Sequence, residues 1–306
     1  MEKKQPKRIK SIREYHQEHN LPKPEHPLIS VIDFRLIRPL PDENPVSRVF
    51  DFYSIALKHD FNGKIKYGQQ EYDFDEGIMT FMSPGQTLRI EINKDEPVNH
   101  SGWLLLIHPD FFWNTSLALT IKQYGFFDYA VNEALFLSEK EEGIVTGIMQ
   151  YIQQEYHANI DVFSQNIIIA QLELLLSYAE RYYQRQFITR KIVNHQLLAR
   201  LENLLDLYFE REDIIDKGLP TVHFVADELH VSPDYLSGLL KVLTGMNTQQ
   251  HIHQKLIEKA KEMLSSTSLS VSEIAYQLGF EHLPSFSKLF KAKTNLSPLN
   301  FRQSFN

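Results

Sequence analysis

One short segment occurs twice near the end of the chain, at residues 225–248 and again at 274–298. The first halves of the two copies align at a constant offset of 49 residues, and the second halves align at 50. The aligned pairs are Val225 and Ile274, Ala226 and Ala275, Leu229 and Leu278, Val231 and Phe280, Leu236 and Phe286, Leu240 and Phe290, Lys241 and Lys291, and Gly245 and Asn295. Such a repeat indicates one small supersecondary unit that the chain uses twice.

Each copy is predicted to be a helix, a short turn and a second helix. In copy two, Ser270 and Glu273 form a capping box at the start of the first helix, and Gly279 suits the left-handed cap at its end. In copy one, Ser232 and Pro233 suit the N-cap and the first turn of the second helix. These are the features of a helix-turn-helix, whose second helix enters the major groove of DNA.

The side chains that remain outside the apolar faces of the second helices are predicted to face DNA. In copy one they are Asp234, Ser237, Gly238 and Lys241; in copy two they are Leu283, Pro284, Ser287, Lys288 and Lys291. The alternative for Lys288, Lys291 and the nearby Lys293 is a merely solvated face, the usual fate of clustered charges. Their place on the second helix of a repeated unit favours contact with DNA for Lys288 and Lys291.

Between the copies, residues 248–266 are predicted to form one helix of nineteen residues. Such a helix is roughly 28 Å long at 1.5 Å per residue, and one turn of DNA is about 34 Å. A rod of this length is compatible with two second helices in successive major grooves on one side of a duplex.

Charge is distributed unevenly along the chain, which carries a net charge of −7. From residue 231 onward there are eight Lys or Arg and five Asp or Glu, so this part is +3 and the preceding part is −10. The C-terminal part is therefore where a polyanion is tolerated. The chain has no cysteine, which excludes disulfides and thiolate chemistry, and its start lacks the apolar core of a signal peptide. Apolar runs are too short to cross a membrane, so a cytoplasmic protein is expected.

The N-terminal half has a different pattern. Up to about residue 45 the chain is Pro-rich and is predicted to be an irregular arm, and residues 47–107 contain short β-prone runs typical of antiparallel strands in a sandwich or small barrel. Helices are predicted at 139–157 and 163–187, followed by a linker at 184–196. The second helix carries an apolar seam with two alternatives, packing on its own barrel or contact with a second subunit. The seam consists of Ile168, Leu172, Leu175, Ala179 and Tyr182.

The segments "EIAYQLGF", "FSKLFK" and "LSPLNFR", with "VSPDYLSGLLKVLTG" in copy one, resemble the DNA-binding domain of AraC-type transcription regulators over residues 200–306. More loosely, "GKIKYGQQEYDFDEGIMTFMSPGQ" resembles the cupin-like sensor barrels of the same family. The resemblance implies an α+β chain: an arm and antiparallel, cupin-like β-barrel at 1–160, a dimerisation helix and linker at 161–195, and an all-α domain with two helix-turn-helix units at 196–306. It also implies binding of double-stranded DNA, a homodimer and a small-molecule effector.

Some positions depart from the family pattern. Gly238 and the pair Leu283-Pro284 stand where polar base readers are common, and Lys255 replaces the more usual arginine, which removes a planar fork of donors. Few direct hydrogen bonds from these side chains to bases are therefore expected. DNA shape and phosphate contacts are expected to contribute more.

Enzymatic activity is not expected, although some cupin barrels are metalloenzymes. His59, His100 and His108 are widely spread, and His251 and His253 lie about 200° apart on a helix, so neither set suits a metal. No phosphate-binding loop or nucleophile elbow occurs, and no cofactor is expected. The second candidate function is a protein-interaction module that uses the same helices and senses no ligand. The pattern does not identify an effector, its pocket residues, the DNA sequence bound or the sign of regulation.

Overall fold

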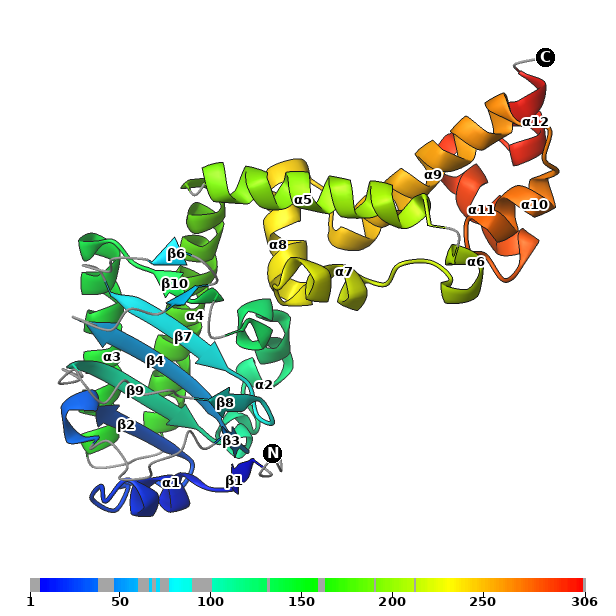
Figure 1. The fold of residues 1–306 in the computed structure, drawn as a ribbon. Helices are drawn as coiled ribbons and strands as arrows, with labels where there is room; N and C mark the ends of the chain where they lie inside the picture. The colour runs from blue at the N-terminus through cyan, green and yellow to red at the C-terminus, as the bar shows by residue number, and fades with distance from the viewer. Residues whose placement is uncertain are drawn as a thin grey trace. The chain divides into compact units, whose positions relative to one another are not determined.

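The structure is a computed structural model of the 306-residue chain. It describes residues 6–37, 47–59, 66–67, 70–71, 77–89, 101–130, 133–158, 163–189, 191–211 and 213–304. The chain forms two compact units, Met1–Gln186 and Phe187–Asn306. The first unit combines sheets with helices and the second is helical (Figure 1), which confirms the α+β class.

A five-stranded antiparallel sheet is the centre of the N-terminal unit, with the strand order β10-β7-β4-β9-β2. Its members are β2 (Ile29–Asp33), β4 (Tyr53–His59), β7 (Ile78–Met82), β9 (Ser101–Ile107) and β10 (Leu135–Phe136). The central strand β4 pairs with β7 on one side and with β9 on the other. Because both faces of β4 are covered, its residues Tyr53 to Leu57 are all buried, as expected for a strand without a solvent face.

The remaining strands form smaller sheets. β3 (Ser47–Phe50) lies between β1 (Lys7–Ile9), to which it is parallel, and β8 (Thr87–Arg89), to which it is antiparallel. β5 (Lys66–Tyr67) and β6 (Gln70–Glu71) form a two-stranded ladder. Over the described residues the strands make separate sheets, one of them with a parallel pair. The predicted barrel is therefore not closed there, and much of the segment that suggested a cupin lies outside the described residues.

The N-terminal arm is structured, which contradicts the prediction of an irregular segment. It contains β1, the helix α1 (Ile12–Glu18) and β2, and Ile9 and Ile12 are 0% exposed in a core with Phe50 and Leu106. Ser11 Oγ accepts a hydrogen bond from the Glu14 amide, and the Glu14 carboxylate accepts one from the Lys10 amide. The sequence contains the residues of this arrangement, which is close to a capping box. The nearby prolines nevertheless favoured the prediction of an irregular segment.

Besides α1, the described part of this unit contains further helices and short 3-10 turns. They are α2 (Leu117–Thr120), α3 (Glu139–His157) and α4 (Ser164–Thr189), with single 3-10 turns η1 (Phe34–Leu36), η2 (Pro109–Phe112), η3 (Ile121–Gln123) and η4 (Gly125–Asp128). α3 has the predicted bounds, and α4 is close to its predicted range. The predicted linker at 184–196 is instead helical, because α4 continues to Thr189 and α5 begins at Lys191. Gln186 and Arg185 hold this end of α4 on β10, through 2.8 and 2.7 Å bonds to the Phe136 backbone.

The apolar seam of α4 is covered by the chain itself. Ile168, Leu172, Leu175, Ala179 and Tyr182 are each between 0 and 4% exposed. The structure thus supports the first alternative, packing within its own unit, and corrects the assignment of these five residues to a subunit contact. The side chains that α4 presents outward are different ones, among them Ile167 and Leu174, each 45% exposed.

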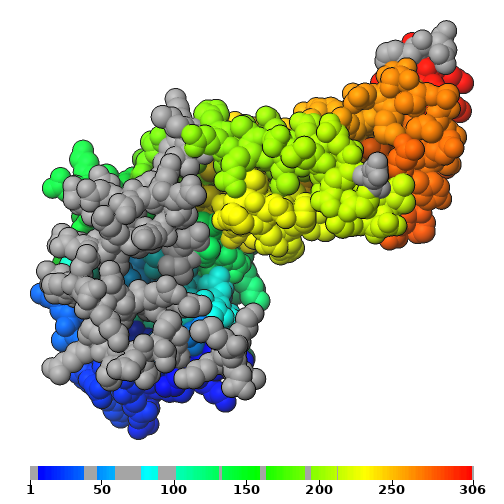
Figure 2. All heavy atoms as spheres, in the orientation of Figure 1, coloured from blue at the N-terminus to red at the C-terminus, as the bar shows by residue number. Residues whose placement is uncertain are grey.

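The C-terminal unit consists of helices only. They are α5 (Lys191–Phe209), α6 (Ile214–Lys217), α7 (Val222–Leu229), α8 (Pro233–Thr244), α9 (Thr248–Ser266), α10 (Val271–Gln277), α11 (Leu283–Thr294) and α12 (Pro298–Gln303). α9 has the predicted bounds. Within this unit, α7 and α8 lie toward one end and α10 to α12 toward the other (Figure 2, yellow and orange to red). No helix in the described ranges is long and apolar enough to cross a bilayer.

Two hydrophobic cores fill this unit, one for each copy of the repeat. The first contains Leu201 and Leu205 of α5 with Leu236, Leu240 and Ile252. The second is built around Tyr208, Leu256, Leu278, Phe286 and Phe290. Both α5 and α9 contribute to both cores, so these two helices hold the copies together.

Candidate nucleic-acid interface

Copy one is a helix-turn-helix whose ends are capped locally. Thr221 Oγ1 accepts a 3.1 Å hydrogen bond from the Phe224 amide at the start of α7, and α7 ends at His230 with a left-handed φ of 60°. Ser232 Oγ caps α8 by accepting from the Tyr235 amide at 3.3 Å, and Pro233 occupies the first turn, where no amide donor is needed. The caps fix where each helix begins, and thereby which face of α8 points outward.

Copy two repeats this arrangement with a longer turn, residues 278–282 in place of 230–232. The predicted capping box is present: the Ser270 amide donates to Glu273 at 2.6 Å, and the Glu273 amide donates to Ser270 Oγ at 3.2 Å. Gly279 follows α10 with a φ of +84°. A Cβ atom on Gly279 would lie 2.9 Å from the backbone carbon of Gly218. This glycine therefore provides both the left-handed cap and room for the segment after α6.

The repeat extends further than the aligned apolar residues. Thr244 Oγ1 donates to the Leu240 carbonyl at 2.8 Å and accepts from the Met246 amide at 3.2 Å. Thr294 makes the same two bonds, at the same distances, to Phe290 and Leu296. In each copy a capped third helix follows, α9 after Asn247 and α12 after Ser297. Each copy of the repeat therefore has three helices. The third helix of copy two was not predicted from the sequence, because α12 is only six residues long.

The residues predicted to face DNA from copy one are all on α8, but they differ in accessibility. Asp234 and Lys241 are exposed, whereas Ser237 and Gly238 are half-buried. Ser237 Oγ lies 2.9 Å from Oγ1 of the fully buried Thr248, so this hydroxyl connects α8 to α9. The described face therefore offers two charged side chains of opposite sign.

In copy two the predicted residues lie on α11. Pro284, Lys288 and Lys291 are exposed, and Ser287 is half-buried. Leu283 packs against the second hydrophobic core. Leu283 is half-buried, so it helps to anchor the start of α11, and the exposed charged side chains of this helix are its lysines.

The lysines of α9 have partners inside the chain. Lys255 forms an ion pair with Asp206 of α5, and that carboxylate raises the pKa of the lysine. One turn later, Lys259 lies 3.8 Å from Glu210, the residue after α5, and 3.3 Å from Glu262. The sequence contains a sign of this pairing. The acids at 206 and 210 and the bases at 255 and 259 have the same spacing of four residues.

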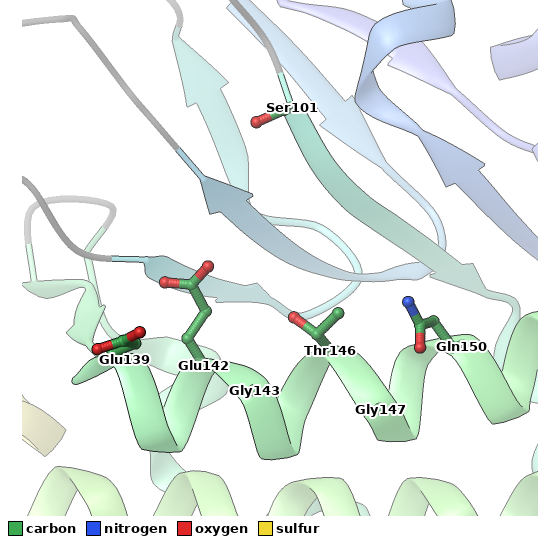
Figure 3. Close-up of a pocket in the computed structure, with 7 residues that line it drawn as sticks. All are labelled: Ser101, Glu139, Glu142, Gly143, Thr146, Gly147 and Gln150. Carbon is green, nitrogen blue, oxygen red and sulfur yellow. The ribbon is translucent and has the colours of Figure 1, made fainter.

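The N-terminal unit, considered by itself, contains a hollow of about 530 Å³ between α3 and the start of β9. Figure 3 shows Ser101 across from Glu142, Thr146 and Gln150 of α3. The Glu142 carboxylate accepts a 2.9 Å bond from the Gly77 amide, so part of the lining is structural. Among the residues that the structure describes, no group of three His, Cys, Asp or Glu is placed to hold a metal ion.

Comparison with known proteins is consistent with these features. A sequence profile for a helix-turn-helix domain matches residues 225–304. The chain is 31% identical over 142 residues to "Uncharacterized HTH-type transcriptional regulator YfiF" of Bacillus subtilis, covering 46% of this chain and 42% of that protein. It is 37% identical over 79 residues to the HTH-type transcriptional activator RhaS of Escherichia coli, covering 26% of this chain and 28% of that one. The chain thus spans less than half the length of these relatives.

Among solved structures, a transcriptional regulator of Chromobacterium violaceum with an AraC-type DNA-binding domain is 21% identical, with a TM-score of 0.32. The match covers 36% of this chain and 93% of that chain. The resemblance noted in the sequence is confirmed at the C-terminal end, where the matched profile, over residues 225–304, includes both copies of the repeat. At its C-terminal end the chain therefore carries a helix-turn-helix domain of the AraC type.

Proposed function

We propose that the chain regulates transcription by binding duplex DNA through α8 and α11. The observation that supports this proposal most directly is the duplication of a complete unit. Each copy buries one side of its second helix in its own core and leaves a charged side uncovered. This is the arrangement in which a second helix enters a major groove.

A gel-shift titration of the full chain with a labelled duplex of random sequence tests the proposal. At physiological salt we expect a shifted band with a dissociation constant of about 10⁻⁴ to 10⁻⁶ M, the range of non-specific binding, and tighter binding at lower salt. Unlabelled duplex should compete for the chain. If a folded chain gives no shift at any salt concentration, the helices serve another purpose, and a protein-interaction module becomes the better account.

We propose in addition that the chain is a homodimer through the outward face of α4. Ile167, Ala170 and Leu174 are exposed and follow one another at steps of three and four residues, the spacing of a helix-to-helix contact. This face differs from the seam predicted from the sequence, which is buried.

A small effector is proposed to act on the N-terminal unit. The hollow beside α3 has a volume within the range of small-molecule sites, roughly 300–1,000 Å³. Its lining includes the carboxylates of Glu139 and Glu142 together with Thr146 and Gln150. These groups suit a cationic or hydroxyl-rich molecule.

A further inference from the structure

The two helix-turn-helix copies differ in charge although they share a fold. Residues 222–244 contain one lysine and three acids, Asp227, Glu228 and Asp234, for a net charge of −2. Residues 271–294 contain three lysines and two acids, Glu273 and Glu281, for a net charge of +1. On the second helices themselves, α8 has one lysine and one acid, whereas α11 has three lysines and no acid.

The other cations of the C-terminal unit have partners within the chain. Of the eight Lys and Arg after residue 230, Lys255 and Lys259 form ion pairs with Asp206 and Glu210. Arg302 Nε donates to the Leu264 carbonyl at 3.1 Å, and Lys261 lies 6.0 Å from the centre of the Phe301 ring. The other four cations are Lys241 on α8 and the three lysines of α11. All four are exposed.

Binding to the phosphate backbone depends on cations that are free to replace condensed counterions, and each such contact contributes about 0.9 to the salt slope. We propose that copy two is the electrostatic anchor of the complex, and that copy one docks on its half-site only while copy two is bound. This inference rests on the proposed function, since it concerns how the two copies share one DNA site. Lys288 and Lys291 are the anchoring residues, and Lys241 stands at the position of copy one that corresponds to Lys291.

The absence of cysteine from the chain gives a direct way to assign the half-sites. An Ala292→Cys variant, at an exposed position of α11, can carry an iron chelate that cleaves the DNA beside copy two. Hydroxyl-radical footprints of the full chain on a selected site are then recorded over a range of salt concentrations. We expect two protected stretches at low salt, and on raising the salt we expect the stretch away from the chelate to be lost first.

Charge-removing variants at corresponding positions complete the test. Lys288→Gln with Lys291→Gln should remove both protected stretches together and reduce the salt slope by about 0.9 for each lysine. Lys241→Gln should remove only the protected stretch of copy one, and it should reduce the salt slope by less than the double variant does. Circular dichroism checks that each variant is folded, as expected for exposed side chains.

The inference is overturned if the stretch of copy one survives to higher salt than that of copy two, or if it persists in the double variant. A parent chain that protects no DNA at any salt concentration would instead contradict the proposed function itself, so the two failures are distinct.

Discussion

At position 279 the chain requires glycine for two separate reasons. The φ of +84° costs a residue with a side chain about 1–2 kcal/mol. In addition, a Cβ atom would meet the Gly218 backbone at 2.9 Å, a distance that one of the two segments must relieve by moving. Gly245 ends α8 with a similar φ of +77°, but nothing lies within 4 Å of its Cβ position.

These two glycines make a matched pair for a measurement. We expect Gly245→Ala to lower the free energy of unfolding by about 1–2 kcal/mol, from backbone strain alone. Gly279→Ala should lower it by clearly more, because the close approach to Gly218 adds to the strain. Urea denaturation of both variants gives the comparison, and equal losses would show that the approach between residues 218 and 279 contributes nothing.

At the scale of single elements, the helices with strong local signals were predicted well. α3 and α9 have the predicted bounds because capping residues and apolar periodicity agree in both. α1 and the region around Thr189 were missed for the opposite reason: prolines beside α1 suggested a loop, and a polar stretch at 184–196 suggested a linker. In the structure, both regions are held by contacts between residues far apart in sequence. One example is the 2.8 Å hydrogen bond from the Phe136 amide to Gln186.

α4 shows why a periodic pattern alone does not reveal what a helix packs against. Leu172 is 0% exposed and Leu174, two residues later, is 45% exposed. We expect Leu172→Asp to lower the free energy of unfolding by about 4 kcal/mol, since it buries a charge without a partner. When unfolding is measured at a concentration at which the parent chain is monomeric, Leu174→Asp should change it by less than about 0.5 kcal/mol.

The same pair of variants tests the proposed dimer. In sedimentation experiments at micromolar concentration, the parent chain should be dimeric, and folded Leu174→Asp should be shifted toward monomer. A monomeric parent, or a Leu174→Asp variant as dimeric as the parent, would contradict an interface on the outward face of α4.

At the scale of the molecule, the C-terminal unit closes two cores with its own helices. We therefore expect a fragment of residues 187–306 to fold alone and to unfold cooperatively on heating, with a helical circular dichroism spectrum. A fragment with the spectrum of a disordered chain would show that the N-terminal unit is needed for folding.

The candidate site was predictable to the extent that it is local. The second helix of each copy, its caps and its exposed lysines follow from the repeat. The core role of Leu283, the bond of Ser237 to Thr248 and the pairing of Lys255 with Asp206 depend on where other helices lie. The pattern of one helix contains no information on those positions, so these assignments needed the structure.

The central claim is that one chain binds DNA with two helix-turn-helix copies, which α5 and α9 hold together. Selection of bound duplexes from a random pool by the full chain, followed by sequencing, tests this claim most directly. We predict that the selected sites contain two short motifs in the same orientation, with centres about 10 bp apart, one helical turn. A single short motif, or two motifs without a fixed spacing, would contradict the account.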